Sequence, residues 1–237
     1  MPEHAPSQLL ATVEVIHWIA LGIMVVVYCL RLMWLFRFNK ASDRSAPGNP
    51  GQADAKGGGL YSLGNVVMPW AMESTRKPKG FVFWLSFVVF HIGVVAGISL
   101  AFVSSLYRPI VEAPNVAYCV GGALTAAFLV GLYRLARRFG RPVMRLISTP
   151  DDYFSLIMMT VWFLLGAFAQ GHIAGASAFA AEGYLVAFLI ATSFFLLYVP
   201  FSKISHYLYY PFTRYWIGRT LGHRGSYPYS RAPRSAS

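Results

Sequence analysis

The residues best suited to chemistry in this chain are histidines that fall within apolar sequence. Four of the 6 histidines lie within or at the ends of long uncharged stretches: His17, His91, His172 and His206. An ionisable side chain inside a membrane is costly, so a functional role is the first interpretation. A neutral imidazole can ligate a metal, relay a proton or hydrogen-bond a neighbouring helix. Two imidazoles from facing helices can also hold a haem iron from both axial sides.

The cysteines limit which redox groups the chain can hold. Cys29 and Cys119 are the 2 cysteines, too few for the four thiolates of an iron–sulfur cluster. No Cys-x-x-Cys-His run attaches a c-type haem. A redox group bound to this chain must therefore be held without thioether links.

Two glycines follow one of the histidines at helical spacing. Gly93 and Gly97 come after His91 and form a Gly-x-x-x-Gly pair, which removes side-chain bulk from one helix face. A flat porphyrin edge could lie against such a strip. Close packing of two helices uses the same pattern, and spacing alone does not choose between these interpretations.

The elements that position these residues are predicted by composition. Of 237 residues, 56% are hydrophobic and 12% charged, against about 25% charged in soluble proteins. Four uncharged blocks are long enough for the roughly 20 helical residues that a bilayer core requires, and a fifth, near the start of the chain, is interrupted only by Arg31. We therefore expect an all-α integral membrane five-helix bundle, with helices at about 13–36, 81–106, 114–134, 152–172 and 183–209.

The cations predict the orientation of this bundle. The chain carries 20 Lys and Arg against 9 Asp and Glu, a net charge of +11. That balance would favour a nucleic-acid partner in a polar chain, but the apolar content argues against it. All the cations except Arg31 and Arg108 fall on one side of a five-helix threading. The positive-inside rule then places the N-terminus outside and the C-terminus in the cytoplasm.

The remaining segments predict a simple domain organisation. Residues 1–221 form one transmembrane domain, with a cytoplasmic linker at 37–80 and a flexible cytoplasmic tail at 222–237. Within the linker, residues 40–59 are rich in Gly, Ala, Ser, Asp and Pro and are expected to be flexible. Residues 60–72 are expected to be interfacial or to face a partner. Asp151 and Asp152 are expected to cap the fourth helix.

Three stretches of the sequence carry a recognisable pattern: FHIG at 90–93 with Gly97, RRF at 137–139 running to TPDD at 149–152, and PFSKISH at 200–206. This pattern resembles the gamma subunit of respiratory nitrate reductase and its relatives. Those relatives include cytochrome b subunits of sulfite-reduction-associated membrane complexes and of membrane-bound heterodisulfide reductases. The resemblance covers roughly residues 81–222.

The resemblance implies a multi-pass b-type cytochrome subunit of the prokaryotic cytoplasmic (inner) membrane. Such a subunit passes electrons between the quinone pool and a cytoplasmic partner, which is an iron–sulfur, heterodisulfide-reductase-like or molybdoenzyme subunit. The chain would then be the electron-transfer subunit of a respiratory-chain oxidoreductase. His91 and His206 match the axial ligands of the inner haem b.

The outer haem of the nitrate reductase pattern cannot be held in the same way here. Ala101 and Phe188 stand where that pattern has its second pair of histidines. A second haem is therefore absent or re-ligated. His17 and His172 are both expected near the outer face. They could ligate that haem, bind a quinone, or only hydrogen-bond a backbone carbonyl.

Three basic residues are candidates to bind the haem propionates: Lys203, Arg214 and Arg76. Anchoring to anionic membrane lipid is the alternative for each of them. Two rival functions also stay open, a haem-free membrane anchor and a small transporter whose histidines relay protons.

Overall fold

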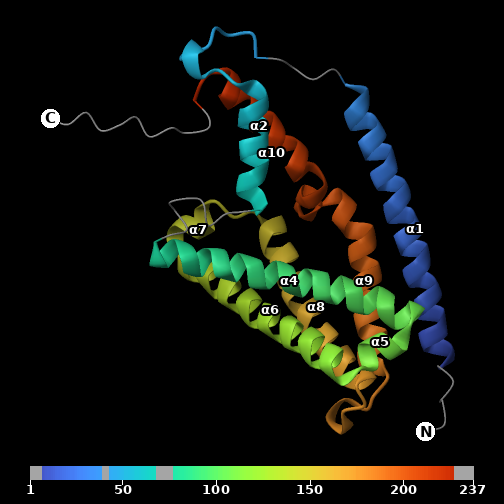
Figure 1. Ribbon diagram of the computed structural model, residues 1–237. Coiled ribbons are helices and arrows are strands. Elements are labelled where there is room, and N and C mark those ends of the chain that lie inside the picture. Colours follow the sequence, from blue (N-terminus) through green and yellow to red (C-terminus); the bar gives the residue numbers. More distant parts are fainter. Residues whose placement is uncertain (1–6, 39–42, 68–76, 227–237) are drawn as a thin grey trace. The chain divides into compact units, whose positions relative to one another are not determined.

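In the computed structural model, which describes residues 7–38, 43–67 and 77–226, every regular element is a helix (Figure 1). Five helices of this part are long and apolar enough to cross a membrane, which confirms the all-α class. They are α1 (Gln8–Arg37), α4 (Pro78–Leu106), α6 (Pro114–Gly140), α8 (Pro150–Ile173) and α9 (Gly183–Tyr198). Short helices and turns lie in the connections: α5 (Arg108–Glu112), α7 (Pro142–Leu146) and the 3-10 turn η3 (Ser177–Phe179).

Proline determines where several of these helices begin. α4, α6 and α8 each start at a proline, whose fixed φ suits the first helical turn and whose missing N–H would be unpaired there anyway. α8 has in addition a capping box, in which the Thr149 N–H donates to the Asp152 carboxylate across 2.8 Å. The expected capping role of Asp152 is confirmed.

The fifth apolar helix is shorter than expected. α9 ends at Tyr198, and the turns η4 (Val199–Phe201) and η5 (Lys203–Ser205) follow it. Pro200 has no N–H to continue the helix. A separate helix, α10 (His206–His223), then begins, so the expected single helix over 183–209 is corrected to two helices. The third helix is longer than expected and reaches Gly140.

The chain divides into two compact units. The first unit comprises Met1–Leu32 and Phe83–Ile204, and the second comprises Met33–Val82 and Ser205–Ser237. His17, His91 and His172 belong to the first unit, and His206 belongs to the second.

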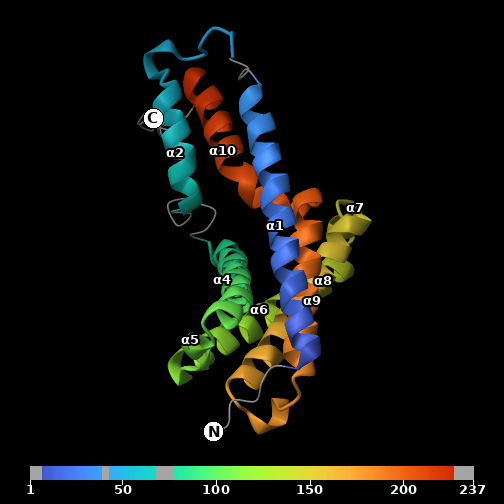
Figure 2. The ribbon, with the colours of Figure 1, turned by 90° about the vertical axis from the view of Figure 1, so that its right-hand side faces the viewer.

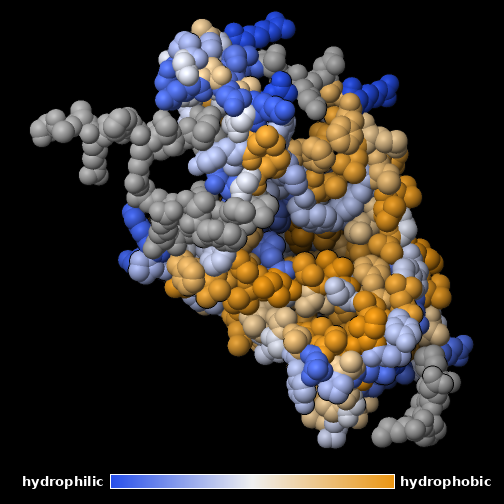
Figure 3. Space-filling view, viewed as in Figure 1, coloured by the Kyte–Doolittle hydropathy of each residue, from blue (hydrophilic) through white to orange (hydrophobic). Residues whose placement is uncertain are grey.

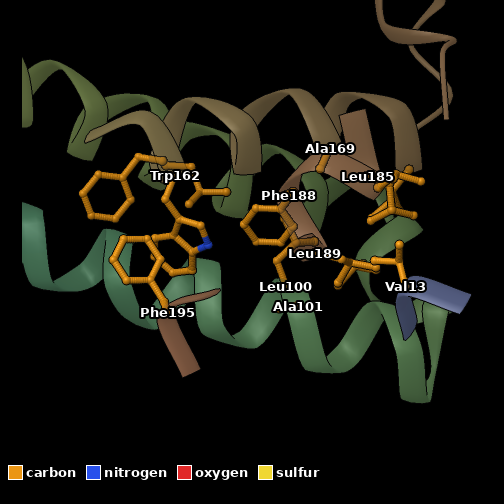
Figure 4. Packing of buried hydrophobic residues seen from close by; sticks show 14 of the residues in the cluster. Val13, Leu100, Ala101, Trp162, Ala169, Leu185, Phe188, Leu189 and Phe195 are labelled. Atoms are coloured by element: carbon orange, nitrogen blue, oxygen red, sulfur yellow. The ribbon is translucent and has the colours of Figure 1, made fainter. Parts of the chain in front are cut away.

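The core of the first unit is packed from α4, α6, α8 and α9. Figure 4 shows Trp162 of α8 beside Phe188 and Phe195 of α9. The Trp162 Nε1–H donates to Thr192 Oγ1 across 2.8 Å, so the buried indole has its hydrogen-bond partner within the core. Leu100 and Leu189 are fully buried in the same cluster. These contacts hold α8 and α9 at a defined level relative to each other.

The outside of the first unit carries large apolar side chains. Figure 3 shows apolar surface along α1 and α4. The exposed apolar residues of these two helices include Ile19, Val26, Val95 and Ile98, each about half exposed or more. A soluble protein rarely exposes apolar patches of this extent. The surface therefore suits contact with lipid.

In the second unit, α2 (Ala55–Val67) lies side by side with α10 (Figures 1 and 2). Small residues make the close approach possible. A Cβ added at Gly58 would lie 2.5 Å from the carbonyl oxygen of Gly218 and 2.6 Å from the Cα of Gly222. The Ser62 Cβ occupies the space beside Gly218 one turn further along. The two helices thus cross through a small-x-x-x-small pattern on each side.

The helix α2 takes up residues 55–59 of the linker that was expected to be flexible over 40–59, of which residues 40–42 lie outside the described part. A 3-10 turn, η1 (Pro50–Gln52), precedes α2, which begins at Ala55. Glycines at 57–59 disfavour an isolated helix by about 1 kcal/mol each relative to alanine. Packing against α10 stabilises the helix despite this. The expected tail at 222–237 begins inside α10, and its residues 227–237 lie outside the described part.

Polar contacts join the segment before α2 to the end of α10. Arg224 Nε donates to the Asp43 carboxylate across 2.6 Å, and the Asp54 N–H donates to the Gly222 carbonyl across 2.9 Å. Hydrogen bonds from Ser45, followed by the one from Arg224, lower the pKa of Asp43 well below its usual value. His223, expected outside the spans, pairs its Nε2 with the Ser45 carbonyl at 2.9 Å.

Candidate functional site

His91 is oriented by the turn of α4 that precedes it. Its Nδ1 lies 2.8 Å from the Phe87 carbonyl oxygen, and the His91 and Phe87 rings are 4.0 Å apart. The carbonyl can only accept, so Nδ1 carries the proton and Nε2 carries the lone pair of the neutral ring. Metal-bound histidines are commonly held in this way, with the second nitrogen donating to a carbonyl. The same bond also satisfies a histidine that has only a structural role.

Gly93 and Gly97 contact protein side chains. A Cβ at Gly93 would clash with the Cβ of Ala127 on α6, and a Cβ at Gly97 would lie 2.9 Å from the Trp162 ring of α8. The side-chain-free strip of α4 is therefore filled by the neighbouring helices. Of the two interpretations of Gly93 and Gly97, this geometry matches close helix packing and not a surface for a porphyrin.

His206 is the first residue of α10 and is exposed in the second unit. His91 lies in the first unit. The pairing of His91 with His206 therefore stays a prediction that rests on the resemblance.

His17 is completely buried in the first unit, with 0% of its surface exposed. Its Nδ1 lies 3.5 Å from the Ser193 Oγ of α9, and its ring packs 5.0 Å from the Phe102 ring of α4. Its Nε2 is buried and has no hydrogen-bond partner among the described residues. A buried polar atom without a partner costs free energy, and a ligand, a proton or a water molecule at Nε2 would remove that cost.

His172 lies in the last turn of α8 and is half-buried. Its Nδ1 is 3.1 Å from the carbonyl oxygen of Phe179 in the connection to α9. This contact ties the end of α8 to the loop. A hydrogen bond to a backbone carbonyl was one of the alternatives expected for His172, and the structure shows this bond.

His17 and His172 lie at different depths. The hydrogen bond from Trp162 to Thr192 places these two residues at one level of α8 and α9. His172 follows Trp162 by ten residues, about 15 Å along the helix. His17 contacts Ser193, the neighbour of Thr192, so it lies about that much deeper than His172. The arrangement supports two separate roles and not one shared iron.

The basic residues expected to face propionates have other surroundings. Lys203 Nζ donates to Thr149 Oγ1 across 2.8 Å and to the Asp152 carboxylate across 3.2 Å. The Arg214 Nε is buried without a hydrogen-bond partner in the described part of the second unit. Arg76 lies outside the described residues.

Asp151 accepts a hydrogen bond from a tyrosine of the next span. The Tyr198 hydroxyl donates to the Asp151 carboxylate across 2.6 Å, and the Ser155 hydroxyl is 3.1 Å from the same Tyr198 oxygen. Together with the capping box of Asp152, these bonds close the first turn of α8 against α9. Both carboxylates thus have structural partners.

Two arginines of α6, which were not among the predicted site residues, pack against aromatic rings of α4 near His91. The Arg134 guanidinium lies over the Phe90 ring at 4.7 Å, and the Arg137 guanidinium lies over the Phe83 ring at 5.0 Å. The signal that could have found them is their spacing of three residues, which puts both on one helix face.

The described part of the chain contains no group of three or more His, Cys, Asp or Glu side chains that could hold a metal ion. A haem iron needs only two axial protein ligands, because the porphyrin supplies the other four. A single histidine such as His91 could supply one of these two axial ligands.

No family model and no solved structure matches the chain. A curated protein of Nitratidesulfovibrio vulgaris (strain Hildenborough) is 26% identical over 209 residues, which are 85% of this chain and 88% of the relative. Its name, "Protein", states no activity. The similarity therefore spans most of both chains without indicating a function.

Proposed function

We propose that this chain is a membrane cytochrome b subunit that passes electrons between the quinone pool and a cytoplasmic iron–sulfur or catalytic partner. The observation that carries the proposal is the hydrogen bond between His91 Nδ1 and the Phe87 carbonyl, at 2.8 Å. It leaves the lone pair on Nε2, the nitrogen that would ligate an iron. His206 is the proposed second axial ligand, on the strength of the resemblance.

The proposed cofactor is haem b, held without covalent links. When bound, it would supply a one-electron carrier within the membrane. The role of the protein would be to fix the imidazole tautomer and to exclude water. The bond from His91 to Phe87 would fix the tautomer of the imidazole. The aromatic core around Phe90 and Phe163 would exclude water.

The proposed orientation has the N-terminus outside and the C-terminus in the cytoplasm of a prokaryotic inner membrane. It is supported by the distribution of Lys and Arg along the sequence, which a five-helix threading places on one side except for Arg31 and Arg108. The partner would bind on this basic side. By the resemblance, that partner is an iron–sulfur, heterodisulfide-reductase-like or molybdoenzyme subunit.

The proposed quinone contact is His17. The partnerless Nε2 of His17 is an acceptor that can take a hydrogen bond, and later a proton, from a quinol hydroxyl group. His172 is not proposed as its axial partner, because the two histidines lie about 15 Å apart in depth. One haem is therefore proposed, with His17 serving the quinol.

An optical spectrum tests this function. The protein purified from a haem-replete host should show a Soret band and a reduced b-type alpha band, with about one haem per chain. His91→Ala and His206→Ala should each abolish the bands, whereas His223→Ala, which removes a histidine bonded to Ser45, should leave them unchanged. A pure protein without a Soret band would contradict the proposal and favour the haem-free anchor or the transporter.

A further inference from the structure

Two cations inside a membrane-spanning helix have no acidic partner in the described part of the chain. Arg134 and Arg137 are half-buried on α6, and neither takes part in a salt bridge of that part. The Arg137 Nε is buried without a hydrogen-bond partner, and its Nη2 has only the Met144 sulfur, at 3.9 Å. Like charges one helical turn apart also repel each other. An arrangement of this kind is costly unless an anion joins it.

The next arginine of the same helix shows the contrast. Arg138 donates to the Ser148 hydroxyl across 2.8 Å and lies 3.9 Å from the Asp152 carboxylate. The Asp152 carboxylate is thus shared between Arg138 and Lys203, and the neighbouring Asp151 accepts from Tyr198. Arg134 and Arg137 are left facing aromatic rings.

Those rings belong to the face of α4 that carries His91. Phe83, Phe87 and His91 follow one another at four-residue spacing and so share one helix face. The Arg137 guanidinium lies over Phe83, two turns before His91. The Arg134 guanidinium lies over Phe90, whose ring centre is 6.2 Å from that of His91. The two unpaired cations therefore line the path from His91 toward the start of α4.

We infer that Arg134 and Arg137 bind the two propionate carboxylates of the haem held at His91, an inference that rests on the proposed function. Haem b carries two carboxylates, and the guanidinium group is the side chain best matched to a carboxylate in a poorly hydrated site. The pair takes the place of Lys203, Arg214 and Arg76 as propionate ligands. Lys203 already bonds Thr149 and Asp152.

Reconstitution of the apoprotein with haem or with haem dimethyl ester tests the inference. The ester has the same porphyrin and iron but no charged propionates. The wild type should bind haem at least about tenfold more tightly than the ester, the ratio expected for one charge-assisted hydrogen bond. R134Q/R137Q should lose this preference, and R134K/R137K should recover part of it. R145Q, which removes an exposed cation of α7, should keep it.

The redox potential gives a second readout. Cations beside the haem favour its reduced, less positive state, so R134Q/R137Q should have a lower midpoint potential than the wild type and R145Q. If the wild type binds haem and its ester equally well, the inference is overturned while the proposed function stands. If the wild type binds neither haem nor its ester, both the inference and the proposed function are contradicted.

A lipid phosphate is the competing source of negative charge. If a lipid phosphate pairs with the two arginines, the wild type should melt at a higher temperature in phosphatidylglycerol than in phosphatidylcholine, and R134Q/R137Q should melt at the same temperature in both. The preference for haem over its ester should then be the same in the wild type and in R134Q/R137Q. That result would overturn the inference. The inference would be supported if R134Q/R137Q lost the preference for haem over its ester while its melting temperature depended on lipid type as that of the wild type does.

Discussion

His17 and Ser193, separated by 176 positions, meet in the interior of the first unit with Nδ1 and Oγ 3.5 Å apart. The Ser193 hydroxyl already donates its proton to the Leu189 carbonyl across 2.8 Å. Ser193 can therefore only accept from His17, which places the imidazole proton on Nδ1 and the lone pair on the buried Nε2. A histidine held in this state is ready to accept a hydrogen bond from a ligand.

Replacing His17 with leucine should separate stability from function. The change removes a buried nitrogen that lacks a partner, whose desolvation costs about 1–3 kcal/mol. We expect the melting temperature to stay the same or to rise. Reduction of the haem by added quinol, followed by stopped-flow absorbance, should slow at least about tenfold, the loss expected for one hydrogen bond to the quinol.

His172→Leu is the matched control for this variant. It removes a histidine of the same unit that lies about 15 Å away in depth, so quinol oxidation should remain close to that of the wild type. A His17→Leu protein that melts much earlier but still reduces its haem at the normal rate would assign His17 a purely structural role.

The contact between α2 and α10 predicts opposite effects for two glycines of one helix. In Gly58→Ala, the added Cβ meets the backbone of Gly218 and Gly222, which cannot rotate away. Overpacking of this kind costs about 1–3 kcal/mol. In Gly64→Ala, nothing lies within 4 Å of the new Cβ, so the better helix propensity of alanine should stabilise by about 0.5–1 kcal/mol.

Thermal unfolding together with limited proteolysis of residues 55–67 measures both changes. Gly58→Ala should lower the melting temperature and increase cleavage in α2, while Gly64→Ala should do the reverse. Equal behaviour of the two variants would refute the close contact between these helices.

Composition predicted the five apolar helices because lipid leaves an uncharged stretch of this length few other conformations. It missed α2 for a definite reason. Gly58 and its neighbours are typical of a linker when read locally, and only Gly218 and Gly222, far along the chain, explain why they form a helix. The same limit applies to Gly93, whose role depends on Ala127 of another helix.

Charge was also only partly readable from sequence. Arg134 and Arg138 both counted as evidence for orientation, and nothing in their spacing distinguished them. Only the fold shows that Arg138 meets Asp152 whereas Arg134 faces Phe90. Partners of side chains that lie on different helices depend on helix rotation and register, which hydrophobic blocks do not determine.

Trp162→Phe should weaken the first unit modestly. The phenylalanine ring can keep its stacking on Phe188, which lies 5.7 Å away, but it cannot donate to Thr192. Hydrogen bonds between membrane helices contribute about 0.6–2 kcal/mol, and a loss of this size is expected in unfolding by denaturing detergent. Thr192→Val should cost a similar amount, and the double variant should cost less than the sum. Strict additivity would show that the two side chains are not coupled.

Asp43→Asn should destabilise the second unit in a pH-dependent way. The folded pKa of Asp43 lies below its ordinary value of 3.8, so its contribution is fully present above that pH and is lost as the pH falls below it. The difference in melting temperature between wild type and Asp43→Asn should therefore be constant near neutral pH and shrink below about pH 4. Arg224→Gln should reproduce part of the neutral-pH loss, because it breaks the 2.6 Å ion pair but keeps the hydrogen bonds from Ser45 to the carboxylate, and adding it to Asp43→Asn should change little more. A difference that grew on acidification would mean that the carboxylate is not the stabilising form.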